Sequence, residues 1–334
     1  MNEENINTPP RSELIFIYDI KDANPNGDPL QDNRPRMDDL TGCVLVSDLR
    51  LKRFIRDYWI SKFGINAVFV VRREQEGNVL VREERVEELI EGGIISKENF
   101  VEDVIKKFID HRVFGALVTV KGKGKEQKER LRPVSKIGPV QFAFGRSLHR
   151  VEPTMHQGIS VFASRENRLQ GTLISWWTVP YAVICFYGII NDVCAEETGM
   201  TVKDKEELME AMWHGIEHYT SRTKHSHRPL LLIDVEYKEE YFQIGRIDEY
   251  VRLRILKKDL PEEAIRKLED YAIDLTSLVN VLNEFKDRIS KVRVRARHDL
   301  RICIGDEVFE GREIVEKLKS TLHEIPVEEL TFPS

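Results

Sequence analysis

Clusters of basic residues are the features of this sequence that are best suited to bind a ligand. Four of them occur, at residues 50–56, 121–132, 221–228 and 286–301. In the first, RLKRFIR, four cations fall within two helical turns and repel one another unless acids or an external anion offset their charge. Asp48 and Asp57 supply part of that offset. Several clusters that converge on strand ends would track a phosphate backbone, whereas a single cluster is usually a solvated surface.

The loop before the first cluster is rich in carboxylates. It contains Asp19, Asp22, Asp28, Asp32, Asp38 and Asp39. Clustered carboxylates can bind a divalent ion that activates water for hydrolysis. Asp and Asn also initiate turns without any chemistry, and the stretch NPNGDP is typical of a turn. The residues alone leave both interpretations open.

Other candidate sites are weaker. His214 and His218 are four residues apart and two further histidines follow, but Gly215 occupies the place of the general base in an HExxH zinc motif. The GKGK at 122–125 is not a Walker motif, and NPNGDP lacks the glycine pattern of a dinucleotide site. We therefore expect neither a metal nor a cofactor.

The composition is that of a folded protein from a reducing compartment. The 334 residues, 41% hydrophobic and 32% charged, would suit one large or two ordinary domains. The net charge is −6, but nucleic-acid recognition needs only a local basic face. Four widely spaced cysteines without a CxxC pair favour the cytoplasm. The N-terminus has no signal-peptide core, and the longest apolar run, 174–190, contains Pro180, so we expect a buried strand there and no membrane association.

The elements that must position these residues begin with a strand and a helix. ELIFIYDI (13–20) is nearly continuous in apolar residues and predicts a core strand. Ser47 can cap a helix in which the residues of one apolar stripe are Leu51, Phe54, Ile55 and Tyr58. This pattern places the cations of the first cluster away from the buried side; they are Arg50, Lys52, Arg53 and Arg56.

Strands and helices are interspersed along the rest of the chain. Residues 1–12 are predicted to be a flexible tail, 67–84 a pair of strands, and 147–175 a projecting hairpin or a flexible loop. Further strands are expected at 112–120, 138–145, 229–237 and 291–296. Helices are expected at 203–222, 261–287 and 311–323. The order lacks strict βαβ alternation, which favours an α+β fold.

One long stretch matches a known family. NPNGDPLQDNRPRMDDLTG (24–42) and VSDLRLKRFIRDYW (46–59) closely resemble the N-terminal signature of the CRISPR-associated Cascade backbone subunit. This is the Cas-seven family, particularly the Csd/Csh branch of type I systems, and the likeness is closer to Csh. The FG at 114–115, GPVQF followed by GRSLHRV, and HRPLLLIDVEY occur in the expected order. The resemblance covers about residues 13 to 240; its first motif is specific and the later ones are short.

This resemblance implies an architecture and a role. The palm, residues 13–59 and 111–334, would be RRM-like (ferredoxin-like), with a helical insertion at 60–110 and a protruding thumb at 147–175. Copies would stack head to tail along the spacer of a guide RNA (crRNA), each thumb flipping out one nucleotide. The remaining bases would pair with target DNA, so sequence recognition is delegated to base pairing. The implied partners are Cas-five-like, large and repeat-processing subunits of a cytoplasmic antiviral complex, and no catalysis is implied.

The resemblance also assigns residues to RNA binding. The Asn/Pro/Gly loop would approach the RNA backbone closely, and the basic helix would hold phosphates. Arg34 and Arg36 would join them, or else pair with Asp38 or Asp39. The predicted RNA-binding residues are Asn24, Asn26, Arg34, Arg36, Ser47, Arg50, Lys52, Arg53, Arg56, Gly138, Pro139, Gln141, Ser147, His149, Met155, Arg222 and Lys224.

Some alternatives stay open. On the thumb, Met155, Val161 and Phe162 could wedge between bases or pack on a neighbouring subunit. The basic cluster at 286–301 could touch RNA, a neighbour or nothing. The chain could instead be a metal-dependent endoribonuclease of the same superfamily that uses Asp28 or Asp32, or a stand-alone single-stranded RNA-binding protein.

Overall fold

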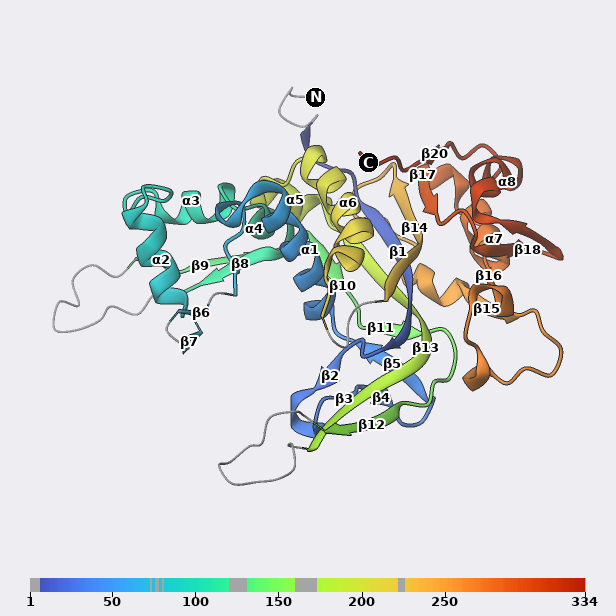
Figure 1. Cartoon of the computed structure of the whole chain (residues 1–334). Coiled ribbons are helices and arrows are strands. Elements are labelled where there is room, and N and C mark those ends of the chain that lie inside the picture. The colour runs from blue at the N-terminus through green and yellow to red at the C-terminus, as the bar shows by residue number, and fades with distance from the viewer. Residues whose placement is uncertain are drawn as a thin grey trace.

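A large mixed sheet organises the molecule (Figure 1). The computed structural model describes residues 7–72, 74–75, 78–79, 81–119, 131–159, 173–221 and 226–333. The sheet has ten strands in the order β20-β17-β14-β1-β13-β11-β5-β4, and β10 and β12 also pair with β13. These strands are β1 (Ser12–Ala23), β4 (Met37–Asp38), β5 (Cys43–Val46), β10 (Val140–Phe142), β11 (Gly145–Ser147), β12 (Thr154–Ile159), β13 (Leu173–Ile190), β14 (His227–Tyr237), β17 (Ile289–Ala296) and β20 (Val327–Glu329).

Strand β1 lies at the centre of this sheet and is buried on both faces. Leu14, Phe16 and Tyr18 belong to the hydrophobic core on one face, and Ile15 and Ile17 to the core on the other. It pairs antiparallel with β13 on one side and β14 on the other. A strand covered on both faces is a near-continuous apolar run. The predicted core strand at 13–20 is therefore confirmed.

Two long helices cover the first face. They are α1 (Asp48–Phe63), capped by Ser47, and α6 (Val202–His218), capped by Thr201. They pack on each other and on the sheet, where Trp59 and Phe54 are fully buried. Figure 1 shows α5 (Asp192–Thr198) beside them on the same side. The helix predicted at 203–222 is present but ends earlier, at His218.

The C-terminal part of the chain covers the second face. A four-stranded sheet of β15 (Arg252–Ile255), β16 (Tyr271–Asp274), β18 (Arg301–Ile304) and β19 (Glu307–Glu310) lies there with α7 (Thr276–Glu284) and α8 (Ile314–Thr321). The predicted single helix at 261–287 is wrong. Residues 271–274 instead form β16, one of the two inner strands of this small sheet, with Tyr271 and Ile273 in the core, and only Thr276–Glu284 of the predicted range is an α-helix. Long-range pairing has overridden the local helix pattern.

A third, smaller core lies in a lobe of its own. It joins α2 (Arg82–Glu91), α3 (Phe100–Lys106) and the ribbon of β8 (Gly115–Val118) and β9 (Val134–Ile137), with buried side chains that include Phe69, Leu89 and Phe100. Two strands of two residues each, β6 (Glu74–Gln75) and β7 (Asn78–Val79), pair antiparallel and precede α2 in the chain. The strand predicted at 112–120 begins later, because residues 109–114 form α4 (Ile109–Phe114), which packs on α5 and α6.

The segment predicted to project is partly described. Its strand β12 pairs antiparallel with the first residues of β13, from Thr154 opposite Thr178 to Ile159 opposite Leu173. The tip, 160–172, lies outside the described residues, as do the candidates Val161 and Phe162. None of the helices in the described ranges has the length and apolar character of a membrane-spanning segment.

Most cations of the basic cluster at 286–301 pair with acids of the same fold. Arg293 binds the fully buried Asp234, 3.0 Å away, and Lys205 binds the same carboxylate at 2.8 Å. Lys291 pairs with Glu328, and Lys286 with Glu324. Burial opposes the ionised form of Asp234, but the two cations outweigh it, so the pKa of Asp234 lies below its usual range. The cluster is therefore a structural feature of the sheet.

We expect Asp234→Asn to destabilise the protein by about 3–5 kcal/mol, because the substitution leaves two buried cations short of a counter-charge. The urea midpoint of the full chain measures this loss. Glu328→Gln, which breaks the more exposed pair with Lys291, should cost at most about 1 kcal/mol. The depressed pKa means that the contribution of Asp234 is present at neutral pH and disappears as the pH falls through the folded-state value. Equal midpoints for the two variants at neutral pH would contradict the assignment.

Candidate nucleic-acid interface

The Asn/Pro/Gly loop has a defined structure. Strands β2 (Gly27–Asp28) and β3 (Arg34–Pro35) pair across it, and Asp28 caps the short turn between them by accepting from the Leu30 amide at 3.1 Å. The Asn24 side chain donates to the Asn33 carbonyl at 2.7 Å. Gly27 is required here, because a Cβ would lie 2.8 Å from the Asn33 carbonyl oxygen.

Ser47 ties this loop to helix α1. Its hydroxyl accepts from the Arg50 amide at 3.3 Å and donates to the Asn26 side chain at 3.1 Å. The helix cap and the loop are therefore one hydrogen-bonded unit. This explains why a turn-rich stretch is followed so closely by a basic helix.

The two loop arginines differ. Arg36 forms two hydrogen bonds to the Asp28 carboxylate, at 3.2 and 3.3 Å. Its partner is thus not Asp38 or Asp39, and Asp38 pairs instead with Arg146. Arg34 is exposed and lies over the Trp177 ring, with its guanidinium carbon 5.6 Å from the ring centroid. Within the described part of the chain, no carboxylate forms an ion pair with Arg34.

Three cations of α1 are held by acids, and the prediction that the whole cluster lies away from the buried side is wrong. Lys52 is only 7% exposed and pairs with Asp48 at 3.0 Å. Arg56 pairs at 3.0 Å with Asp110, a buried residue of α4. The apolar pattern of α1 predicted an exposed side for these cations, but α4 packs against that side, where Asp110 meets Arg56 and Phe114 lies near Lys52. Arg53 stays half-exposed, 2.7 Å from Asp57.

Arg50 is the exception within the cluster. Its guanidinium lies between the rings of Phe54 and Tyr219, 4.0 and 4.5 Å from their centroids. Its Nε and Nη2 atoms are buried and have no hydrogen-bond partner among the described residues. Burial lowers the pKa of Arg50. The hydroxyl of neighbouring Tyr18 is also buried without a partner in the described ranges.

The predicted palm residues Gly138, Pro139 and Gln141 make contacts within the fold. A Cβ on Gly138 would lie 2.0 Å from the carbonyl carbon of Phe114, so its absence permits close packing. The Pro139 carbonyl accepts from the Asn191 amide at 2.9 Å. Gln141 is exposed, and its side chain donates to the Gly138 carbonyl at 2.9 Å.

Ser147 and His149 are buried, and their contact with RNA stays a prediction. The Ser147 hydroxyl accepts from the Val44 amide at 2.9 Å and donates to the His149 carbonyl at 2.7 Å. The His149 ring lies within hydrogen-bonding distance of the Arg150 carbonyl and the Val183 amide. Burial lowers its pKa, which keeps the imidazole neutral at pH 7. Both side chains connect strands of the sheet.

Loop, helix and hairpin meet at one pocket of about 440 Å³. The loop contributes Asn24, Asn26, Gly27, Asp32 and Asn33, and the helix contributes Arg50. The first residues of β13 supply the other wall, Ser175, Trp176 and Trp177. Figure 1 shows β2, β3, β12 and the start of β13 side by side at one end of the molecule, and β3 packs on β13. The pocket thus unites three segments of the predicted site.

The two tryptophans of this pocket escaped the sequence analysis, which assigned 174–190 to a buried strand as a whole. A signal was present, because two adjacent residues of a strand point to opposite faces and Trp176 and Trp177 cannot both face one core. Met155, a predicted site residue, lies directly opposite Trp177 and is 50% exposed. Predicted residues Arg222 and Lys224 lie outside the described residues.

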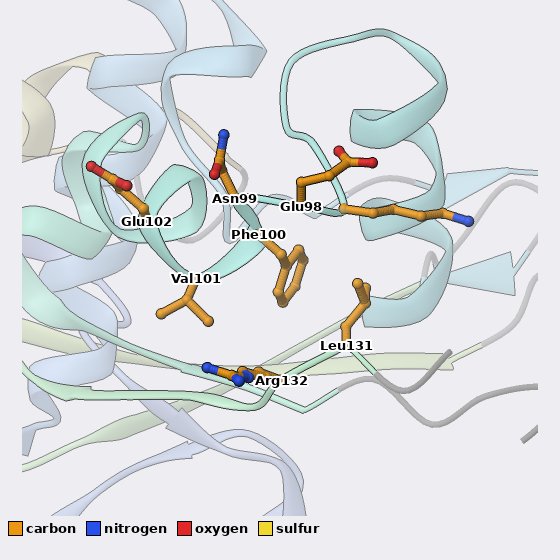
Figure 2. Close-up of a pocket in the computed structure, with 8 residues that line it drawn as sticks. Glu98, Asn99, Phe100, Val101, Glu102, Leu131 and Arg132 are labelled. Atoms are coloured by element: carbon orange, nitrogen blue, oxygen red, sulfur yellow. The ribbon is translucent and has the colours of Figure 1, made fainter. Parts of the chain in front are cut away.

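The other features offer less. A pocket of about 680 Å³ lies in the smaller lobe and contains none of the predicted residues. Figure 2 shows Phe100, Leu131 and Arg132 around it, with Glu98 and Glu102 nearby. The described ranges contain no group of three or more His, Cys, Asp or Glu side chains placed to hold a metal.

Known proteins resemble this chain along most of its length. The sequence matches the family described as CRISPR-associated protein Cas7 over residues 10–276. A relative from Haloferax volcanii, also described as CRISPR-associated protein Cas7, is 31% identical over 332 residues, which cover 94% of this chain and 95% of the relative.

Two solved structures share the fold. One, described as a CRISPR RNA-guided surveillance complex, pre-nicking, has a TM-score of 0.53 and 12% identity over 93% of this chain and 100% of that chain. The other, a CRISPR RNA-guided surveillance complex, has a TM-score of 0.50 and 14% identity over 86% and 88%. The fold and the sequence thus lead to the same assignment. The chain belongs to the CRISPR-associated protein Cas7 family.

Proposed function

We propose that this chain is a non-catalytic backbone subunit of a type I CRISPR interference complex, which binds the guide RNA along its spacer. The observation that carries the proposal is the meeting of the Asn/Pro/Gly loop, the capped end of α1 and the β12–β13 hairpin at one pocket. Arg34 and Arg50 stand there without a carboxylate partner among the described residues, so an external anion is the natural counter-charge.

The strand order supports an RRM-like palm. The chain runs from β1 through α1 to β11 and β13, then through α6 to β14, and the spatial order is β14-β1-β13-β11. Two helices therefore cover one face of an antiparallel sheet whose central strands are β1 and β13. This is the arrangement expected of a ferredoxin-like unit, and the β12–β13 hairpin projects from it as the thumb.

Assembly follows from the same proposal. Copies would stack head to tail on the guide RNA, because an open filament uses two different surfaces of each subunit. The guide would recruit target DNA by base pairing, and Cas-five-like, large and repeat-processing subunits would complete the complex. The four cysteines are free thiols, which agrees with the reducing cytoplasm that we propose.

The first test is a titration of the purified chain against a labelled guide-like RNA of spacer length on a native gel. We expect a ladder of slower bands, because successive copies add along one strand. Arg34→Ala should weaken binding about tenfold and reduce the slope of log affinity against log salt by about one, since one phosphate contact is lost.

Lys286→Ala is the matched control for this titration. It also removes one positive charge, but from a cation that pairs with Glu324 in the C-terminal part of the chain. It should leave the ladder unchanged. Equal affinities for the Arg34 and Lys286 variants would contradict the proposed site, and a single discrete band on long RNA would favour a stand-alone RNA-binding protein.

We expect the bound RNA to stay intact in the presence of magnesium, as judged on a denaturing gel. A metal-dependent nuclease would need Asp28 or Asp32 to bind the metal ion. The Asp28 carboxylate is already occupied, because it pairs with Arg36 and caps the turn before Asp32. An endoribonuclease would instead give shortened RNA that requires a divalent ion. Loss of that product in Asp32→Ala, with Asp39→Ala as the control, would establish the nuclease alternative.

A further inference from the structure

We propose that two copies of this chain pair through the end of the molecule opposite the β12–β13 hairpin, with Tyr241 of each copy in a pocket of the other. Two features carry this inference, an exposed tyrosine on a strained loop and an apolar pocket with a basic rim. Figure 1 shows α5, the helix that links the two features, far from β12. The inference goes beyond RNA binding, because it uses none of the residues predicted to contact RNA.

Tyr241 follows the end of β14 and has an unusual backbone. The residue is 72% exposed, and its φ is 65°. A non-glycine residue at positive φ is strained, and such residues gather at functional sites, where the surrounding structure enforces them. The guanidinium carbon of Arg11 lies 5.8 Å from the centroid of the Tyr241 ring. An exposed aromatic side chain held in this way has the character of an anchor for a partner.

The loop that carries Tyr241 is fixed by its neighbours. The Phe242 ring packs on Tyr237, with centroids 5.3 Å apart. The buried carboxylate of Glu13 accepts from the Gly245 amide at 3.0 Å. Tyr241 is thus held in its exposed position, and it loses little conformational entropy when it docks.

The pocket, of about 520 Å³, lies between α1, α4 and α6. Its apolar lining includes Phe63, Ala67 and Ile109. Phe63 is 44% exposed, and Val202, the first residue of α6, is exposed beside the pocket. The volume falls within the range of roughly 300–1,000 Å³ that is typical of ligand sites, so an aromatic side chain fits with its neighbours. Exposed apolar surface with a polar rim marks an interaction site.

The charges at the rim of the pocket match those beside Tyr241. The rim contains Lys106, Lys107 and Lys203. The first two pair with acids of α3, whereas Lys203 is exposed and has no ion pair among the described residues. Glu240, directly before Tyr241, is likewise exposed and has no ion pair within the described ranges. These two charges are therefore available to meet across an interface.

The lining disfavours a nucleic acid as the occupant. Asp204 and Glu207 also line the pocket, where Arg112 and Lys62 hold them at 2.7 and 2.6 Å. Lys203 is then the one lining cation that lacks an ion pair in the described part of the chain. A row of phosphates would find little counter-charge there. One carboxylate beside one aromatic ring is the better match.

The two features lie at the two ends of α5, which permits two equivalent contacts. Asp192, the first residue of α5, lines a hollow together with Tyr241, and Gly199, directly after α5, lines the pocket. Because α5 has seven residues, its ends are about 10 Å apart. Tyr241 is fixed in its loop and does not line the pocket of its own chain. A two-fold axis near α5 lets each copy place Tyr241 in the pocket of the other.

Analytical ultracentrifugation of the RNA-free full chain measures this pairing. We expect the mass to rise from 39.0 kDa toward twice that value as the concentration increases through the micromolar range. Tyr241→Gly removes the ring and relieves the positive φ, and it should weaken the dimer by about tenfold or more. Tyr241→Phe keeps the ring and should dimerise within about twofold of the wild type.

A charge exchange tests the contact between Lys203 and Glu240. Lys203→Glu or Glu240→Lys alone should weaken the dimer about three- to tenfold, since like charges then meet. The double variant should recover most of the affinity, which a purely structural role of either residue would not produce. Lys258→Glu is the control, because it reverses another exposed lysine that has no ion pair among the described residues, and it should leave the dimer unchanged.

Several results would overturn the pairing. The mass could stay at 39.0 kDa at every concentration, or the dimer could be unchanged in both Tyr241→Gly and Lys203→Glu. A mass that rises beyond twice the monomer would indicate an open row of copies. A loss of RNA affinity in Lys203→Glu as large as that in Arg34→Ala would assign the pocket to RNA. Arg34→Ala should dimerise as the wild type does, so the pairing and the RNA-binding function fail separately.

Discussion

The pairing of β1 with β13 is the constraint on which the rest of the structure depends. The two strands are in register from Ser12 opposite Ile190 to Ala23 opposite Val179, with Asp22 and Pro180 skipped. Asp22 adopts a positive φ of 50° there, opposite a proline that has no amide to donate. Because β1 ends and β13 continues beyond it, the start of β13 extends out of the core. The last pair of β1 and β13 is Ala23 with Val179. The loop that begins at Asn24 therefore lies beside Trp177, which precedes Val179 by two residues in β13.

The same pairing explains how a buried sheet delivers a surface site. Residues of β13 after Val179 belong to the two cores, whereas those before it form the hairpin with β12. One continuous strand thus belongs to the core at one end and lines the pocket at the other. Helix α1 adds the third wall, because its cap Ser47 is hydrogen-bonded to Asn26 in the loop. A shift of the register by one residue would exchange the faces of the two tryptophans.

The hydrophobic periodicity of the sequence predicted most helices and strands well. It predicted poorly which residues surround their polar side chains. Periodicity was sufficient for β1, α6 and β14, since each has a long apolar pattern that only one element type fits. It failed for residues 261–287, where the pairing of β16 with β15 and β18 decides the structure. It also failed for Lys52 and Arg56. Arg56 meets an acid on α4, a helix far along the sequence, and no spacing rule contains that information.

Charge pairing also bears on the RNA site that we propose for this acidic chain. Most cations of the cluster at 286–301 and of α1 pair with acids of the same fold, which weakens the external field of those cations. Two cations for which no ion pair is seen among the described residues, Arg34 and Arg50, lie beside aromatic rings near the pocket. An aromatic ring stabilises a cation without neutralising its charge. The charges of Arg34 and Arg50 therefore stay without an acidic partner where loop, helix and hairpin meet.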